Sequence, residues 1–281
     1  MEIHGQANML MRELNLKNKE LINKLEGLEV EIKKIINDEP TWKLALQADL
    51  ARQDPNIRRQ KGYPEEHLYQ HSPHWDILPE NCIDLNGKMD PCGQEYLNLQ
   101  MKLMAENNRS NASNGFPNKE VFFSLNCLEG VKGLDFCSNI RKKVSDISYK
   151  FLGGNSMALC AFYPPGGYIP WHHNGNAPGY NILLHFRLGG NGSFFTWDDG
   201  KIVEYKDKPN GWVCRAGRFL DTIFDNFSGK HAGGPGQPTP HVGVMGASWH
   251  SARTFDWRFT LSTITNSREL WLDIIDELEA E

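Results

Sequence analysis

The sequence lacks three features that would place it in well-defined protein classes. Its six cysteines never stand in a C-x-x-C spacing, which argues against a zinc knuckle and against a thioredoxin-type redox motif. No stretch approaches the roughly 20 apolar residues of a membrane-spanning helix, and no N-terminal run has the basic start and apolar core of a secretory signal. We therefore expect a cytoplasmic protein with free thiols and no membrane partner.

A surplus of basic charge is also absent. The formal net charge is −5 at pH 7, so lysine and arginine form no dense excess that would attract a polyanion, and a nucleic-acid partner is unsupported. What the chain does have is apolar material, because 40% of its 281 residues are hydrophobic. That is enough to bury a sizeable core, in one large domain or two small ones.

The first 150 residues combine helical patterns with loop-rich stretches. From Met9 to Asn37 apolar residues recur at steps of three and four, which predicts an amphipathic helix that ends at Glu39-Pro40. This helix either docks on its own domain or, because part of the pattern fits a heptad seam, forms a coiled coil that makes a homo-oligomer. Weaker patterns predict helices at 41–52, 95–104 and 133–148 and a strand at 120–125.

From Ser156 to Thr265 the pattern changes to short apolar or alternating runs separated by turn residues. The runs are SMALCAFY, GGYIPWH, YNILLHFRL, GSFFTWD, KIVEYK, GWVCRA, VGVMGASWH and WRFTLSTI. Short strands without intervening helices predict an all-β sandwich or barrel rather than a βαβ fold. We expect a mainly β chain with added helices (α+β): a helical, loop-rich region at 1–150 packed on a β core at 151–268, then a C-terminal helix at 269–281.

Two stretches of this β core carry the residues best suited to chemistry. YIPWHHNGNAPGYN contains His172, His173 and Asn174, and SWHSARTFDWRFTLS contains His250 and Arg258. Side chains two apart in a strand point to the same side, so His172 and Asn174 can converge while His173 faces a neighbouring group or a substrate. Two imidazoles and usually one carboxylate on one face of a metal are typical of a non-haem ferrous oxygenase.

An arginine and its neighbours supply an anchor for a dicarboxylate. The planar guanidinium of Arg258 suits the far carboxylate of a co-substrate such as 2-oxoglutarate, and Thr260, on the same strand face, could add a hydroxyl donor. His185, in NILLHFRL, either points at that carboxylate or is a core histidine bonded to a neighbouring strand, and the sequence leaves both open. Arg253, nearer to His250, is expected at the turn between two strands.

These residues resemble the 2-oxoglutarate/Fe(II)-dependent dioxygenase superfamily, and more loosely its prolyl hydroxylase and aspartyl/asparaginyl β-hydroxylase branches, from about Ala158 to Thr265. YPPGGYIPWHHN is similar to the strand pair that carries the first metal ligand, and WHSARTFDWRFTLS to the pair with the distal histidine and the arginine. The resemblance implies a double-stranded β-helix of the jelly-roll or cupin type. In it Fe(II) binds His172 and His250, and Arg258 holds the distal carboxylate of 2-oxoglutarate.

The implied activity is a hydroxylase that couples decarboxylation of 2-oxoglutarate to hydroxylation of a prolyl, aspartyl or asparaginyl side chain. A polypeptide substrate is favoured over a small molecule. The sequence departs from the family pattern at Asn174, where most members carry an acid; this residue either coordinates weakly or hydrogen-bonds a water at the third position. The Gly- and Pro-rich stretch at 220–246 is expected to fold over the mouth of the barrel.

Two other functions compete with this interpretation. A non-catalytic, cupin-like module would use the same histidines for a structural metal or for no metal. Metal-assisted hydrolysis would need a carboxylate base, and none stands beside the histidines. A separate group, His67, His71 and His74, is close enough in sequence for a metal, but Pro73 breaks the helical geometry it would need.

Overall fold

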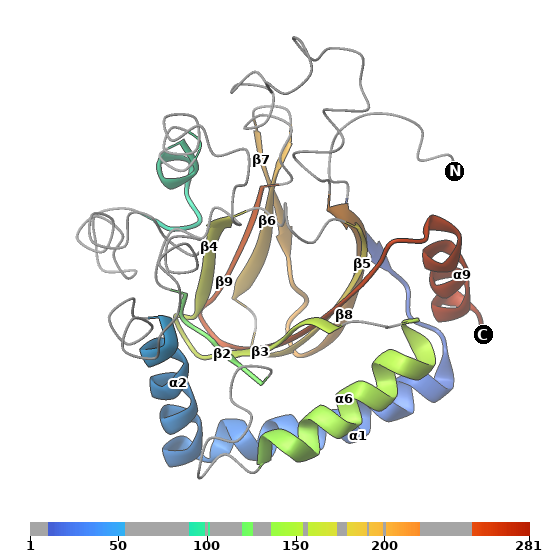
Figure 1. The fold of residues 1–281 in the computed structure, drawn as a ribbon, viewed down its shortest axis with the longest axis horizontal. Helices are drawn as coiled ribbons and strands as arrows, with labels where there is room; N and C mark the ends of the chain where they lie inside the picture. The colour runs from blue at the N-terminus through green and yellow to red at the C-terminus, as the bar shows by residue number, and fades with distance from the viewer. Residues whose placement is uncertain are drawn as a thin grey trace, which may run out of the picture.

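The structure is a computed structural model that describes residues 11–53, 90–98, 101, 120–125, 136–153, 157–172, 179–189, 191–198, 201–219 and 249–281. Within them the chain is a mixture of helices and antiparallel strands (Figure 1). Several sequence predictions fall outside the described residues, namely those on His173, on Asn174, on the histidines at 67, 71 and 74, and on the loop at 220–246.

The strands form two antiparallel sheets. Their bounds are β1 (Arg12–Leu14), β2 (Phe123–Ser124), β3 (Met157–Tyr163), β4 (Tyr168–His172), β5 (Gly179–Leu188), β6 (Gly192–Asp198), β7 (Lys201–Lys206), β8 (Gly211–Phe219), β9 (His250–Thr254) and β10 (Trp257–Thr265). The six-stranded sheet has the order β1-β8-β5-β10-β3-β2 and the four-stranded sheet the order β4-β9-β6-β7. From β3 to β10 the chain passes back and forth between the sheets, except that β6 and β7 pair as a hairpin.

The strand pattern of the sequence is confirmed for the C-terminal half. Seven of the eight runs predicted there coincide with a strand; of the eighth, VGVMGASWH, only Trp249 and His250 are described, and His250 begins β9. The expectation that Arg253 sits at a turn is wrong. Arg253 pairs with Tyr168 of β4 on one side and with Ser193 of β6 on the other, so the strand continues through it because both neighbouring strands offer partners.

The N-terminal helix is shorter than its apolar spacing predicts. α1 spans Lys19–Asn37, whereas Arg12–Leu14, which the pattern placed in the helix, is β1 at the edge of the six-stranded sheet. The helix begins where it does because the side chain of Asn18 accepts a hydrogen bond from the backbone N of Leu21 at 3.0 Å. Upstream of that cap, the edge of β8 offers the backbone partners that a strand needs.

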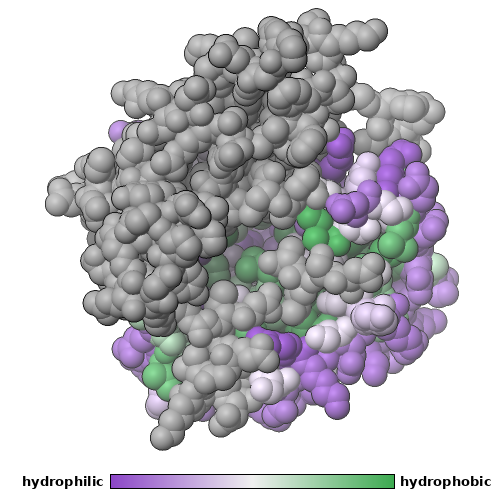
Figure 2. All heavy atoms as spheres, in the orientation of Figure 1, coloured by the Kyte–Doolittle hydropathy of each residue, from purple (hydrophilic) through white to green (hydrophobic). Residues whose placement is uncertain are grey.

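Besides α1, the helices are α2 (Glu39–Gln53), α6 (Phe136–Phe151) and α9 (Arg268–Glu279), and residues 94–98 and 101 are also helical. The helices cover the outer face of the six-stranded sheet, where α1 and α6 lie side by side (Figure 1). One apolar stripe on each of α1, α6 and α9 joins the outward side chains of β3, β5, β8 and β10 in a shared core. Figure 2 shows hydrophilic side chains over these helices and hydrophobic ones toward the middle of the molecule.

Leu28 is fully buried on the stripe of α1 that faces the sheet, and its truncation tests this packing. We expect Leu28→Ala to lower the free energy of unfolding by about 2–5 kcal/mol, because it removes apolar contacts and leaves a cavity. Val30 is on the same helix but 54% exposed, so Val30→Ala should stay within about 0.5 kcal/mol of the parent. Urea denaturation of both variants measures the difference, and equal effects would contradict this docking of α1.

No helix in the described parts of the chain is long and apolar enough to cross a bilayer. The described cysteines Cys92, Cys160 and Cys214 are buried and form no disulfide with one another.

Candidate functional site

The inner faces of the two sheets pack against each other through a second apolar cluster. Leu183 and Tyr163 of the six-stranded sheet share this cluster with Ile169, Phe194 and Ala252 of the four-stranded sheet. Two groups of buried polar side chains flank it, a histidine pair on the smaller sheet and a set of arginines that reaches from the larger one.

The histidine pair lies on neighbouring strands. His172, the last residue of β4, is the cross-strand partner of His250, the first residue of β9, and their ring centroids are 4.0 Å apart. Phe194 of β6 stacks on the His250 ring, with centroids 5.9 Å apart and planes at 29°. Both imidazoles are buried. Two residues that are some eighty positions apart in sequence therefore form one compact group.

The residue before each histidine explains why both rings point inward. Trp171 and Trp249 are fully buried on the opposite face of the sheet, where they pack with Phe195, Cys92 and Tyr96. Because successive side chains of a strand alternate between faces, an outward tryptophan directs the next side chain inward. The repeated dipeptide Trp-His thus positions both imidazoles.

Burial keeps the imidazole of His172 neutral. Its Nδ1 lies 2.8 Å from the carbonyl oxygen of Pro170, and because a carbonyl only accepts, Nδ1 carries the proton. Nε2 is then the nitrogen with the lone pair, as a metal ligand requires. Loss of solvent around the ring lowers the pKa of His172 to about 4.

The pair fits part of a metal site. Neutral imidazoles on adjacent strands can share one divalent ion, and two imidazoles form two thirds of the facial set of a non-haem iron centre. Among the described residues no group of three or more histidine, cysteine, aspartate and glutamate side chains comes together. Asn174, predicted as the third ligand, lies outside those residues.

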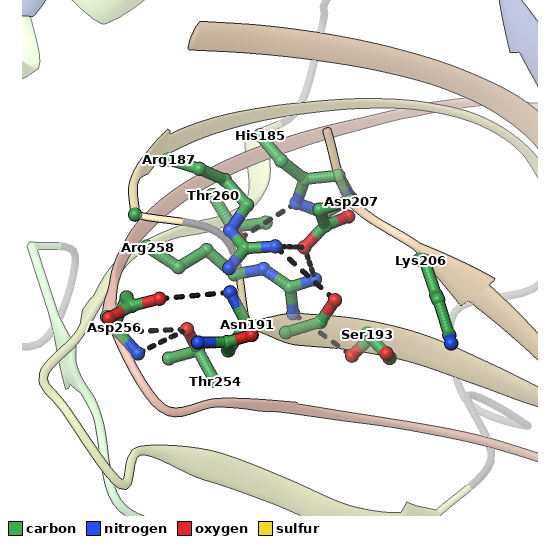
Figure 3. Close-up of polar contacts among 12 residues, drawn as sticks. His185, Arg187, Asn191, Ser193, Lys206, Asp207, Thr254, Asp256, Arg258 and Thr260 are labelled. Atoms are coloured by element: carbon green, nitrogen blue, oxygen red, sulfur yellow. Dashed lines mark hydrogen bonds and ion pairs between the residues drawn. The ribbon is translucent and has the colours of Figure 1, made fainter. Parts of the chain in front are cut away.

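Three arginines converge on one aspartate at the other end of the interior. Figure 3 shows two of them, Arg187 and Arg258, beside Asp207. Arg215 Nη1 donates to Asp207 Oδ1 at 2.7 Å, Arg187 Nη1 lies 3.0 Å from Oδ2, and Arg258 Nη2 pairs with the same Oδ2. All four side chains are at most 1% exposed. We call these four residues the arginine cluster.

The arginine cluster carries more positive than negative charge, and its side chains are almost completely buried. Burial by itself would raise the pKa of Asp207, but the guanidiniums, Arg258 foremost, lower it well below the ordinary value. Glu13 approaches Arg215 only to 4.0 Å and is 37% exposed, so it compensates weakly. Nε of each arginine, and Nη2 of Arg187, have no hydrogen-bond partner among the described residues. Such a group is suited to an anion.

His185 and Thr260 lie beside this cluster as cross-strand partners. His185 Nδ1 is 2.9 Å from Thr260 Oγ1, and His185 Nε2 has no partner within the described part of the chain. Burial, and next the charge of Arg258, lower the pKa of His185 well below its usual value, so the ring is neutral. If Thr260 donates to Nδ1, Nε2 carries a proton that points to no acceptor.

The two groups are separated along strand β6. Thr196 of β6 is the cross-strand partner of His250, and Ser193, three residues earlier, accepts a hydrogen bond from Arg258 Nη1 through its carbonyl oxygen at 3.4 Å. At a rise of 3.3–3.4 Å per residue, the histidine pair and the arginine cluster are roughly 10 Å apart along the strand.

Sequence reasoning found some members of these groups and missed others. The structure brings His172 to His250, and it places His185 and Thr260 beside Arg258. It also adds a set that was not predicted: Arg187, Asp207 and Arg215. Arg187 could have been found, because it stands two residues after His185 in the same strand and so shares its face. Asp207 directly follows the last residue of β7, and no sequence signal connects it to an arginine.

No known family model and no curated protein matches this sequence. A prolyl-4-hydroxylase from Pseudomonas putida is among the solved structures that are similar to the chain, with a TM-score of 0.24 and 14% sequence identity. The match covers 61% of this chain and 88% of that one. A likeness at this level assigns no family.

Proposed function

We propose that the protein is an Fe(II)- and 2-oxoglutarate-dependent oxygenase that hydroxylates a prolyl, aspartyl or asparaginyl side chain of a polypeptide. One observation carries the proposal: a buried pair of imidazoles and a buried, surplus-positive arginine cluster flank the interior of one β sandwich. The first suits a ferrous ion and the second suits the far carboxylate of a diacid.

The strand order supports a double-stranded β-helix as the framework. Strands β8-β5-β10-β3 and strands β4-β9-β6-β7 form the two halves, and consecutive strands cross from one half to the other at all but the β6–β7 hairpin. Interleaving of this kind is how a jelly roll closes two sheets around an interior. In this framework the metal ligands would come from β4 and β9, and the co-substrate anchor from β5 and β10.

The spacing of the two groups supports a five-carbon diacid. Such a molecule is about as long as two residues of extended chain, roughly 6–7 Å. A metal–ligand bond of about 2 Å at one end and a charge-assisted hydrogen bond of about 2.8 Å at the other extend its reach to roughly 11 Å. That length is comparable to the separation of roughly 10 Å between the histidine pair and the arginine cluster along β6.

Each residue has a separate task in this proposal. His172 and His250 would hold the iron, which, with 2-oxoglutarate bound, would supply the activation of dioxygen. Nη2 of Arg258 is already paired with Asp207, so the far carboxylate would meet the donors without a described partner, His185 Nε2 and Arg258 Nε. Thr260 would fix the tautomer and orientation of His185. The apolar side chains between the groups would keep water out.

An anaerobic titration with Fe(II) and 2-oxoglutarate tests the proposal directly. We expect a visible metal-to-ligand charge-transfer band to grow with 2-oxoglutarate, and slow release of succinate once air is admitted. A metal-free sample is the control for both signals. If saturating Fe(II) gives neither the band nor succinate above that control, the oxygenase is excluded and a non-catalytic binding module remains.

A further inference from the structure

Thr196 lies in one row with the two histidines on the inner face of the four-stranded sheet. His172 of β4 pairs with His250 of β9, and His250 pairs in turn with Thr196 of β6. Directly opposed residues of antiparallel strands share a face and have Cβ atoms about 4.5–5.5 Å apart. The Thr196 side chain is therefore the neighbour of the His250 imidazole on the side away from His172.

The Thr196 hydroxyl is buried without a hydrogen-bond partner among the described residues. The residue is 0% exposed, and Oγ1 is one of the buried polar atoms left unsatisfied there. An orphaned hydroxyl bears the full penalty of leaving water, and in a native protein it calls for an explanation. On the other side Thr196 pairs with Val203, so a valine of the same shape would suit this strand position.

The next row along the same face contrasts with this one. On the side of the arginine cluster, Ile169, Ala252 and Phe194 occupy the corresponding positions of the three strands and are all apolar. Ala252 and Phe194 lie two residues from His250 and Thr196, and a register shift in β4 puts Ile169 three residues from His172. The polar row is thus confined to the level of the histidine pair. A ligand held by the two imidazoles would have the Thr196 hydroxyl beside it and hydrocarbon on the side facing the arginine cluster.

We propose that Thr196 is a further positioning residue of this site, whose Oγ1–H donates a hydrogen bond to the carboxylate that 2-oxoglutarate places next to the metal. The inference rests on the proposed oxygenase function. Neutral imidazoles contribute no negative charge, so a divalent ion between them favours an anionic oxygen ligand, and such an oxygen is a strong acceptor. A threonine hydroxyl supplies one donor at that place without adding charge.

Two substitutions separate this role from a structural one. Thr196→Val keeps the shape and removes the hydroxyl, whereas Thr196→Ser keeps the hydroxyl and removes a methyl group. In the metal-free protein we expect the valine variant to melt at or above the parent temperature, because the orphaned group is gone, and the serine variant to melt below it. In the Fe(II)-loaded protein the dissociation constant for 2-oxoglutarate should rise roughly 10- to 100-fold in the valine variant and stay near the parent value in the serine variant.

The outcomes are distinguishable. If the parent binds 2-oxoglutarate and Thr196→Val binds it equally well, the role of Thr196 is refuted while the oxygenase stands. If Thr196→Val melts lower than the parent without metal, its hydroxyl has a structural partner and the inference also fails. If the parent shows no charge-transfer band with Fe(II) and 2-oxoglutarate, the proposed function falls, and the role of Thr196 falls with it.

Discussion

Replacing His250 with alanine is expected to abolish tight metal binding. Only His172 would then remain of the imidazole pair, whose rings are 4.0 Å apart in the parent. Removal of hydrogen-bonding partners that merely orient a ligand commonly costs 10- to 100-fold in metal affinity, so loss of a ligand itself should cost more than about 100-fold. Anaerobic calorimetric titration with Fe(II) measures the effect, and His172→Ala should reproduce it.

His185→Ala provides the matched control, because His185 is also a buried histidine on an inner strand face. It lies beside Thr260 and the arginine cluster instead of beside the pair. We expect its Fe(II) affinity to stay within about twofold of the parent, as distant sites act independently. Its affinity for 2-oxoglutarate should fall. If both variants lost Fe(II) affinity equally, or if His250→Ala lost none, the assignment of separate metal-binding and carboxylate-binding groups would be contradicted.

Alternation along strands made part of the site visible in the sequence. WRFTLSTI read as a strand places Arg258, Thr260 and Ser262 on one face, and the structure buries all three there. The same rule applied to NILLHFRL places Arg187 on the strand face of His185, which makes Arg187 a further candidate for the carboxylate anchor. Periodicity therefore identifies which side chains share a face whenever the strand itself is recognised.

Contacts between distant segments were not visible in the same way. Arg12–Leu14 fits the helical spacing of the residues that follow it, and only the edge of β8, some two hundred positions later, makes it a strand. Asp207 meets Arg258 across 51 positions, and its role depends on three strands that end near one point. Local sequence preferences do not identify such a partner, because the partner is determined by the tertiary structure.

Replacing Asp207 with asparagine is expected to destabilise the protein by about 3–5 kcal/mol. The variant keeps the shape but removes the one described carboxylate that contacts all three guanidiniums, and these are at most 1% exposed. Buried cations that lose their counter-ion repel one another with little screening. Urea denaturation at neutral pH measures the loss, and circular dichroism shows whether the variant still folds.

Asp90→Asn is the matched control, since Asp90 also pairs with an arginine, Arg253, at 2.5 Å, but at the surface, where Asp90 is 42% exposed. A surface pair of this kind contributes about 0–1 kcal/mol, so the control should change little. The pH dependence gives a second check. The pKa of Asp207 is lowered in the folded state, so its stabilisation is present above the unfolded value of about 3.9 and is lost as the pH falls below it. The difference between the parent and Asp207→Asn should therefore shrink below about pH 4.

Arg187→Met, added to Asp207→Asn, decides whether charge is the cause. If repulsion among the guanidiniums destabilises the single variant, removing one of them should restore part of the loss, and the double variant should be more stable than the sum of the two changes predicts. The same experiment bears on the anion site, because each lost cation lowers the positive surplus that a diacid would meet. Simple additivity of the two substitutions would show that Asp207 acts through shape and hydrogen bonds, and the electrostatic account of the cluster would be wrong.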